Sequence, residues 1–94
     1  MTDCNPSPDG LLYLGTTAVT ENARHCQAWA SQSPHTHGYN EDSMFPDASV
    51  AAAENYCRNP DNDWDELWCY TTDPTVEWEN CSVPICSQLI CYIT

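Results

Sequence analysis

Two histidines, His35 and His37, are the side chains of this sequence best suited to acid–base chemistry or to transition-metal binding. No motif places a nucleophile beside either imidazole. The Gly-x-Ser-x-Gly and His-Glu-x-x-His motifs and the glycine-rich phosphate loops do not occur. The sequence therefore predicts a protein that is not an enzyme and that needs no cofactor.

A second candidate for chemistry is the pair of carboxylates on Asp61 and Asp63, which one residue separates. On an extended segment, side chains two positions apart point to the same side and could converge on one cation. The surrounding run, Asn-Pro-Asp-Asn-Asp at 59–63, is also typical of a turn that Asx side chains cap. The residues alone leave both interpretations open.

Cysteine is abundant, with seven residues in a chain of 94. A chain of this length forms one domain, and small secreted domains compensate for a small core with disulfides. The odd number leaves at least one thiol without a partner inside the chain, and the spacing allows many pairings. Zinc is disfavoured, because no Cys-x-x-Cys pair occurs and the intervals are long. We expect a secreted, extracellular protein with no metal site.

The formal net charge is −12, and Arg24 and Arg58 are the only fixed cations. Nucleic-acid binding needs clustered Lys and Arg, so it is excluded, whereas a partner with a basic surface is favoured. No stretch is long and apolar enough to span a membrane. The start of the chain lacks the basic and apolar regions of a signal peptide, which we expect to be absent, removed or supplied elsewhere.

Turn-forming residues interrupt the sequence every few positions, as at 5–10 and 59–63, so the elements between them must be short. Two aromatic and β-branched runs, at 68–72 and 76–79, are predicted to form a small antiparallel pair around a turn at 73–75. The best run of helix formers, at 48–55, predicts at most one or two helical turns.

Several ordered motifs resemble those of the kringle family, and they extend over residues 4–86. The second half of the chain contributes Asn-Tyr-Cys-Arg-Asn-Pro-Asp at 55–61, Trp-Cys-Tyr-Thr-Thr-Asp-Pro at 68–74 and Trp-Glu-Asn-Cys at 78–81. The first half contributes Tyr-Leu-Gly-Thr at 13–16, Cys-Gln-Ala-Trp at 26–29 and Pro-His-Thr-His at 34–37. The segment from Gln27 to Tyr39 is most similar to the plasminogen type of kringle.

This resemblance implies a small disulfide-rich fold, the kringle triple loop, with short antiparallel β-strands and little helix. It implies one domain at 4–86, followed by a C-terminal tail at 87–94, and it puts His35 and His37 at framework positions. The implied disulfides, each contributing about 2–4 kcal/mol, are Cys4–Cys86, Cys26–Cys69 and Cys57–Cys81. Cys91 is left over, and could be free, oxidised or joined to a second chain in a disulfide dimer.

In lysine-binding kringles an aromatic trough carries the methylene stem of the ligand, two carboxylates hold its ammonium group, and a basic side chain holds its carboxylate. The resemblance assigns the carboxylates to Asp61 and Asp63. It assigns the trough to Trp68, Tyr70 and Trp78, whose faces can add cation–π attraction of about 0.5–2 kcal/mol.

Glu77 departs from this pattern, because lysine-binding members carry Arg at its position. At about 4 Å, and at an effective dielectric near 20, a ligand carboxylate would be repelled by up to ~4 kcal/mol, which water would reduce. We therefore expect free lysine and other ω-amino acids to bind poorly. A Lys or Arg side chain on a basic protein surface could still be accepted.

The loop that precedes the trough is acidic and carries an aromatic tip, with Trp64 followed by Asp65 and Glu66. Such a loop resembles a protein-recognition surface, with Trp64 as the anchor, although an exposed loop tip without a role is the alternative. Leu14 and Leu67 replace residues common in the family and are predicted to change the rim of the trough. Loops this divergent also resemble those of an engineered kringle scaffold.

Two hypotheses remain. The first is a non-catalytic module that recognises a protein target through its acidic and aromatic loops, at Trp64, Asp65, Glu66 and Glu77. The alternative is a lysine-binding kringle that docks a plasminogen-like secreted protease or receptor onto basic substrates, through Asp61, Asp63, Trp68, Tyr70 and Trp78. Glu77 distinguishes the two hypotheses, because it weakens the binding of zwitterions.

Overall fold

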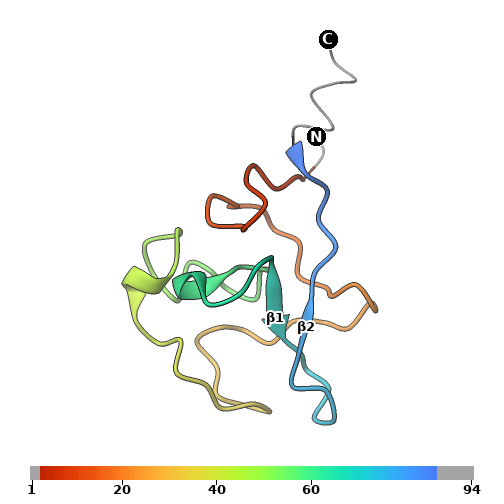
Figure 1. The fold of residues 1–94 in the computed structure, drawn as a ribbon. Coiled ribbons are helices and arrows are strands. Elements are labelled where there is room, and N and C mark those ends of the chain that lie inside the picture. Colours follow the sequence, from red (N-terminus) through yellow and green to blue (C-terminus); the bar gives the residue numbers. More distant parts are fainter. Residues whose placement is uncertain (1–2, 87–94) are drawn as a thin grey trace.

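The computed structural model describes residues 3–86, and most of this part of the chain is loop (Figure 1). Its regular elements are two turns of 3-10 helix and two short strands. In chain order these are η1 (Asp42–Met44), η2 (Pro60–Asn62), β1 (Trp68–Tyr70) and β2 (Trp78–Asn80). Among the described residues no helix is long and apolar enough to span a membrane.

Strands β1 and β2 form one antiparallel ladder, in which Tyr70 lies opposite Trp78 and Trp68 lies opposite Asn80. Each strand is three residues long, so the predicted pair exists but is shorter, and the connection is wider, than the sequence indicated. The reason is Thr71, whose hydroxyl donates to the Val76 carbonyl and accepts a hydrogen bond from the Asp73 amide at 3.0 Å. The Thr71 amide still donates to the Glu77 carbonyl at 3.1 Å, and beyond this bond the side-chain bonds of Thr71 take the place of the ladder.

The segment predicted to hold one or two helical turns contains turns and, within 48–55, no regular helix. Ala48 and Glu54 have positive φ angles of 72° and 45°. Such left-handed residues interrupt a right-handed helix, which explains why good helix formers do not extend one here.

Three disulfides hold the loops together, and they join the cysteines that the resemblance pairs: Cys4–Cys86, Cys26–Cys69 and Cys57–Cys81. The last two bridges lie side by side in the interior, with the sulfurs of Cys26 and Cys57 3.8 Å apart. The Cys4–Cys86 disulfide and a neighbouring parallel β-bridge between Asn5 and Ile85 join the two ends of the described chain. Cys91 and the predicted tail lie outside the described residues.

The hydrophobic core is centred on Trp29, which is 1% exposed. Its indole donates to the Tyr56 carbonyl at 2.7 Å, and its ring meets Phe45, Trp68 and Tyr70 edge to face. Aromatic pairs in this geometry add to the stabilisation that comes from burial alone. The core therefore fixes the underside of β1, whose aromatic residues are candidates for ligand binding.

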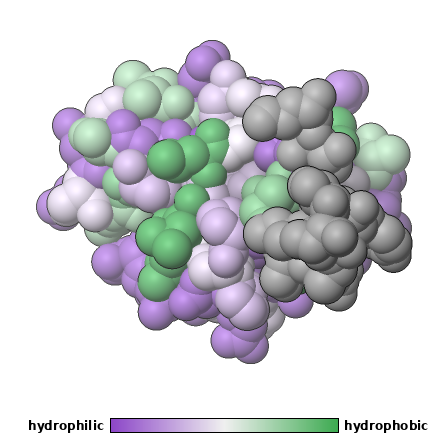
Figure 2. Space-filling view, turned by 90° about the horizontal axis from the view of Figure 1, so that it is seen from above, coloured by the Kyte–Doolittle hydropathy of each residue, from purple (hydrophilic) through white to green (hydrophobic). Residues whose placement is uncertain are grey.

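The two leucines with predicted roles at the rim lie in different environments. Leu67 is 2% exposed and belongs to the core, so the prediction that it shapes a ligand rim is wrong. Leu14 is 61% exposed and lies in the N-terminal loop, beside a hollow at the Cys4–Cys86 bridge. Figure 2 shows the molecule from above, and on the face visible there apolar residues form separate spots among polar ones.

Candidate ligand-binding groove

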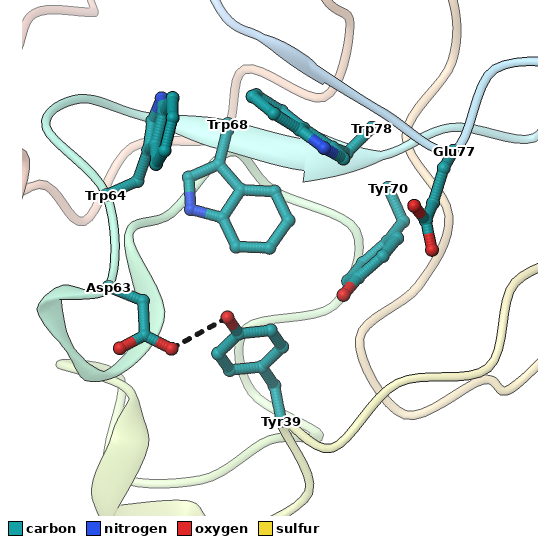
Figure 3. A pocket seen from close by; sticks show the side chains of 7 residues that line it. All are labelled: Tyr39, Asp63, Trp64, Trp68, Tyr70, Glu77 and Trp78. Atoms are coloured by element: carbon teal, nitrogen blue, oxygen red, sulfur yellow. Dashed lines mark hydrogen bonds between the residues drawn. The ribbon is translucent and has the colours of Figure 1, made fainter.

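One open cavity of about 230 Å³ combines aromatic rings with carboxylates (Figure 3). We call it the aromatic groove, and its lining residues are Tyr39, Asp63, Trp64, Trp68, Tyr70, Glu77 and Trp78. Strand β1 supplies Trp68 and Tyr70, β2 supplies Trp78, and loops supply the rest. Six of the nine residues predicted for ligand binding or protein recognition therefore meet in this cavity: Asp63, Trp64, Trp68, Tyr70, Glu77 and Trp78.

The ladder explains how the central rings come together. Trp68 and Tyr70 are two positions apart on β1 and so share one face, and Tyr70 is paired with Trp78 on β2. The ring centroid of Trp68 lies 5.2 Å from that of Tyr70 and 5.9 Å from that of Trp78. Trp68 is 5% exposed and Trp78 is 40% exposed, so the first forms the floor and the second the rim.

Trp64 extends the rim, since its ring meets that of Trp78 at 5.1 Å in an edge-to-face contact. Its backbone is fixed by the buried side chain of Asn59, which accepts from the Trp64 amide at 3.1 Å and donates to the Trp64 carbonyl at 2.8 Å. The residue predicted to anchor a separate recognition loop is thus part of the same wall as the predicted trough.

Asp63 lies at one end of the aromatic groove, and its carboxylate accepts a hydrogen bond from the Tyr39 hydroxyl at 2.8 Å (Figure 3). Burial and this bond to Asp63 raise the pKa of Tyr39 well above its usual value, so the phenol stays neutral and donating. Sequence reasoning did not assign Tyr39 to the site. The fold brings it close from a different loop, and only its place in the resembling segment gave a signal.

Asp61 is oriented differently from Asp63. It lies in η2 with a positive φ of 58°, so the segment is a tight turn and not the extended stretch on which convergence of the two carboxylates depends. Asp61 is exposed, and it is not among the residues that line the groove. Its charge still contributes to the raised pKa of Tyr39. Asp65 and Glu66 are also exposed, and neither lines the cavity.

Glu77 stands at the end of the groove opposite to Asp63, beside Tyr70 (Figure 3). Burial, and then the negative charge of Glu77, raise the pKa of the Tyr70 phenol. Both ends of the aromatic groove therefore carry an exposed carboxylate, and the rings lie between them.

Comparison with known proteins now gives the family. Residues 4–86, which hold the three bridges and every residue of the groove, match the family described as the kringle domain. The chain belongs to the kringle family. Kringle domains are non-catalytic modules that typically bind proteins or lysine-containing ligands.

This kringle is also similar to plasminogen from Capra hircus, with 46% identity over 80 residues, which cover 85% of this chain and 62% of that relative. The chain therefore spans less than two thirds of the length of the relative that it matches. These two comparisons confirm the resemblance to a plasminogen-like kringle and the predicted small disulfide-rich fold.

His35 and His37 of this kringle support the groove from behind. His37 stacks on Tyr70 with ring centroids 5.0 Å apart, and its Nε2 lies 2.9 Å from the Ser31 carbonyl. His35 Nε2 lies 3.0 Å from the Asp73 carbonyl. A ring nitrogen next to a carbonyl oxygen must carry the proton, so each imidazole serves as a donor that fixes the framework.

The four inner cysteines are the group of described side chains whose spacing would suit a metal. Their sulfurs, on Cys26, Cys57, Cys69 and Cys81, lie within 4.8 Å of one another. All four are bonded in the two inner disulfides, and a metal ligand must be a thiolate. These residues therefore serve as a covalent core of this kringle.

Proposed function

We propose that this kringle is a non-catalytic module that docks onto a partner protein. It takes a Lys or Arg side chain from the surface of the partner into the aromatic groove. One observation supports this proposal above all: Asp63, Trp64 and Glu77 line the same cavity as the three trough residues Trp68, Tyr70 and Trp78. The two sets of residues predicted for different functions thus serve one function.

The groove offers what a basic side chain needs. Asp63 can pair with the charged end, and the ring faces can add cation–π attraction of about 0.5–2 kcal/mol. The methylene stem of Lys or Arg can lie along the rings, where its apolar surface is removed from water. Partner recognition then extends from the groove over Asp61, Asp65 and Glu66, whose charges favour a basic protein surface.

Glu77 selects among cationic ligands. A free ω-amino acid would bring its carboxylate to the end of the groove that already carries Glu77. A Lys within a protein has no such carboxylate, since its α-carboxyl group is part of a peptide bond. The groove therefore favours internal basic side chains over zwitterions.

The wider setting follows from the bridges and from the relative. Three disulfides are typical of an oxidising compartment, so we place the module in a secreted protein, without a resident metal or cofactor. The similarity to plasminogen favours a second candidate, in which the kringle docks a secreted protease or receptor onto basic substrates. A disulfide dimer through Cys91 and an engineered origin of the loops stay predictions.

Calorimetric titration of the oxidised monomer tests the proposal. An acetylated, amidated lysine peptide should bind, 6-aminohexanoic acid should bind poorly, and Asp63→Asn should abolish binding of the peptide. Glu77→Arg should reverse the preference toward the zwitterion. Glu21→Gln is a matched control, because it removes an exposed charge outside the groove. Strong binding of 6-aminohexanoic acid by the unmodified chain would contradict the assigned role of Glu77.

A further inference from the structure

The aromatic groove has a carboxylate at each end and no fixed cation. Asp63 and Glu77 both line it, and Figure 3 shows them on opposite sides of the rings. The sequence contains two Lys or Arg residues in all, and both are engaged elsewhere. Arg24 is paired with Asp73 and Glu79, and Arg58 is paired with Asp47.

A ligand with a single positive charge therefore leaves one end of the groove unmatched. If the cation of the ligand lies at Asp63, then Glu77 faces the apolar stem, and its carboxylate must stay hydrated because it has no counter-charge. A second cation at the far end of the stem would meet Glu77 instead. The charge pattern of this groove is thus complementary to two cations that an apolar spacer separates.

A buried polar atom also points to a ligand here. Of the buried side-chain nitrogen and oxygen atoms in residues 3–86, only Trp68 Nε1 and Asn80 Oδ1 have no hydrogen-bond partner. Trp68 is 5% exposed and forms the floor, and Figure 3 shows its Nε1 edge turned toward the side where Asp63 lies. Unpartnered buried donors are rare in folded proteins. Its nitrogen is covered by its neighbours, so a small shift of the side chains around it must uncover it before an acceptor on the ligand, such as an amide carbonyl, satisfies this donor.

We propose that the aromatic groove is a site for a linear dication, in which two ammonium or guanidinium groups flank an apolar stem. This inference rests on the proposed function, because it takes the same groove to bind cations, and it adds the class of ligand. Asp63 holds one cation, Glu77 holds the other, and the rings of Trp68, Tyr70 and Trp78 cover the stem.

Free diamines and pairs of basic side chains on a protein share this chemistry. The Trp68 donor distinguishes them, since a diamine has no acceptor whereas a peptide has carbonyl groups. We expect a peptide that carries two basic side chains to bind more tightly than the best diamine. Equal affinity would assign the site to free diamines.

The test is calorimetric titration of the oxidised chain with α,ω-diamines of increasing length and with the n-alkylamine of each length. A diamine of optimal length should bind about five- to tenfold more tightly than its alkylamine. This exceeds the factor of about two that two equivalent ends give by statistics. High salt should reduce the difference, because the pairs are exposed.

Variants identify the carboxylates. Glu77→Gln should remove the advantage of the diamine and leave alkylamine binding in place, whereas Asp63→Asn should weaken both. Glu21→Gln makes the same change in net charge on an exposed residue outside the groove. It should leave the diamine advantage unchanged, which separates a specific site from general attraction to a chain of net charge −12.

The outcomes separate this inference from the proposed function. If diamine and alkylamine bind equally, and Asp63→Asn still weakens both, the dication site is wrong and the cation groove stands. If Glu21→Gln reduces the advantage as much as Glu77→Gln does, the dication site is also wrong. If no amine and no basic peptide binds, the proposed function fails together with it.

Discussion

Arg58 and Asp47 form a buried, two-pronged ion pair: Nε and Nη2 of the guanidinium each donate to a different carboxylate oxygen at 2.8 Å. The Arg58 side chain is 1% exposed, and that of Asp47 is 9% exposed. The remaining Nη1 donates to the carbonyls of Gly15 and Cys57, and the rings of Tyr13 and Tyr56 lie 5.2 Å from the guanidinium carbon. One side chain therefore ties its own segment at 56–58 to two others, at 13–15 and at Asp47.

Asp47→Asn should destabilise the fold by about 3–5 kcal/mol, because it leaves the buried guanidinium without its counter-charge. Urea denaturation measures this change. Asp65→Asn, on an exposed residue, should change the free energy of unfolding by less than about 0.5 kcal/mol. If Asp47→Asn costs no more than this control, the pair contributes nothing net to stability.

Trp64→Ala should weaken binding of an acetylated, amidated lysine peptide by about 0.5–2 kcal/mol, since it removes part of the rim against which the cation lies. Trp64 is 45% exposed, so the free energy of unfolding should change little. Calorimetry and urea denaturation report the two effects separately. Leu12→Ala, at a 67% exposed position outside the groove, is the control. Unchanged affinity would make Trp64 a loop tip without a role.

The tyrosines predict a loss of stability in alkali. Burial, followed by neighbouring carboxylates, raises the pKa values of Tyr13, Tyr39 and Tyr70 above the ordinary value of 10.0. The unfolded chain then loses its phenol protons first, so their contribution is complete below pH 10 and is lost as pH rises through the folded pKa values. Urea denaturation at a series of pH values from neutral to strongly alkaline should show the decline.

Tyr39→Phe is the variant that checks this explanation. It removes one raised phenol, so the fall in the free energy of unfolding above pH 10 should become shallower. At neutral pH the same variant loses only the hydrogen bond to Asp63, a cost of about 1 kcal/mol. An unchanged alkaline slope would show that Tyr39 titrates like a free tyrosine.

Gly10→Ala and Gly38→Ala are a test variant and its control for the strain that a side chain causes at Gly10. Gly10 has a φ of +79°, and a Cβ there would lie 2.6 Å from Cδ2 of the buried Leu67. Gly10→Ala should therefore destabilise the fold by about 1–3 kcal/mol. A Cβ on Gly38 would meet nothing within 4 Å, so Gly38→Ala should be nearly neutral. Equal effects of the two variants on the urea midpoint would contradict this account.

Local chemistry made part of this molecule predictable. Alternation along an aromatic strand places Trp68 and Tyr70 on one face, and turn residues mark where strands end, so the pairing of 68–70 with 78–80 could be expected. The family resemblance supplied the disulfide framework, which the spacing of the cysteines alone left open.

Other features depend on contacts between distant segments. Tyr39 donates to Asp63, which lies 24 positions further along the chain, and no local pattern reports such a contact. The left-handed turn at Asp61 follows from the geometry of η2, which a run of Asn, Pro and Asp permits but does not require. Leu67 is buried in the core and lies against Gly10, and neither residue alone indicates this contact.

The outer bridge brings the α-carbons of Cys4 and Cys86 to within 5.0 Å, while neither residue lines the aromatic groove. A polypeptide that continues beyond both ends of this domain would therefore enter and leave it at almost the same point. Domains of this kind can be inserted or repeated along a longer chain without altering the binding face. Several grooves on one chain would then bind a multiply basic surface with an avidity that one groove cannot reach.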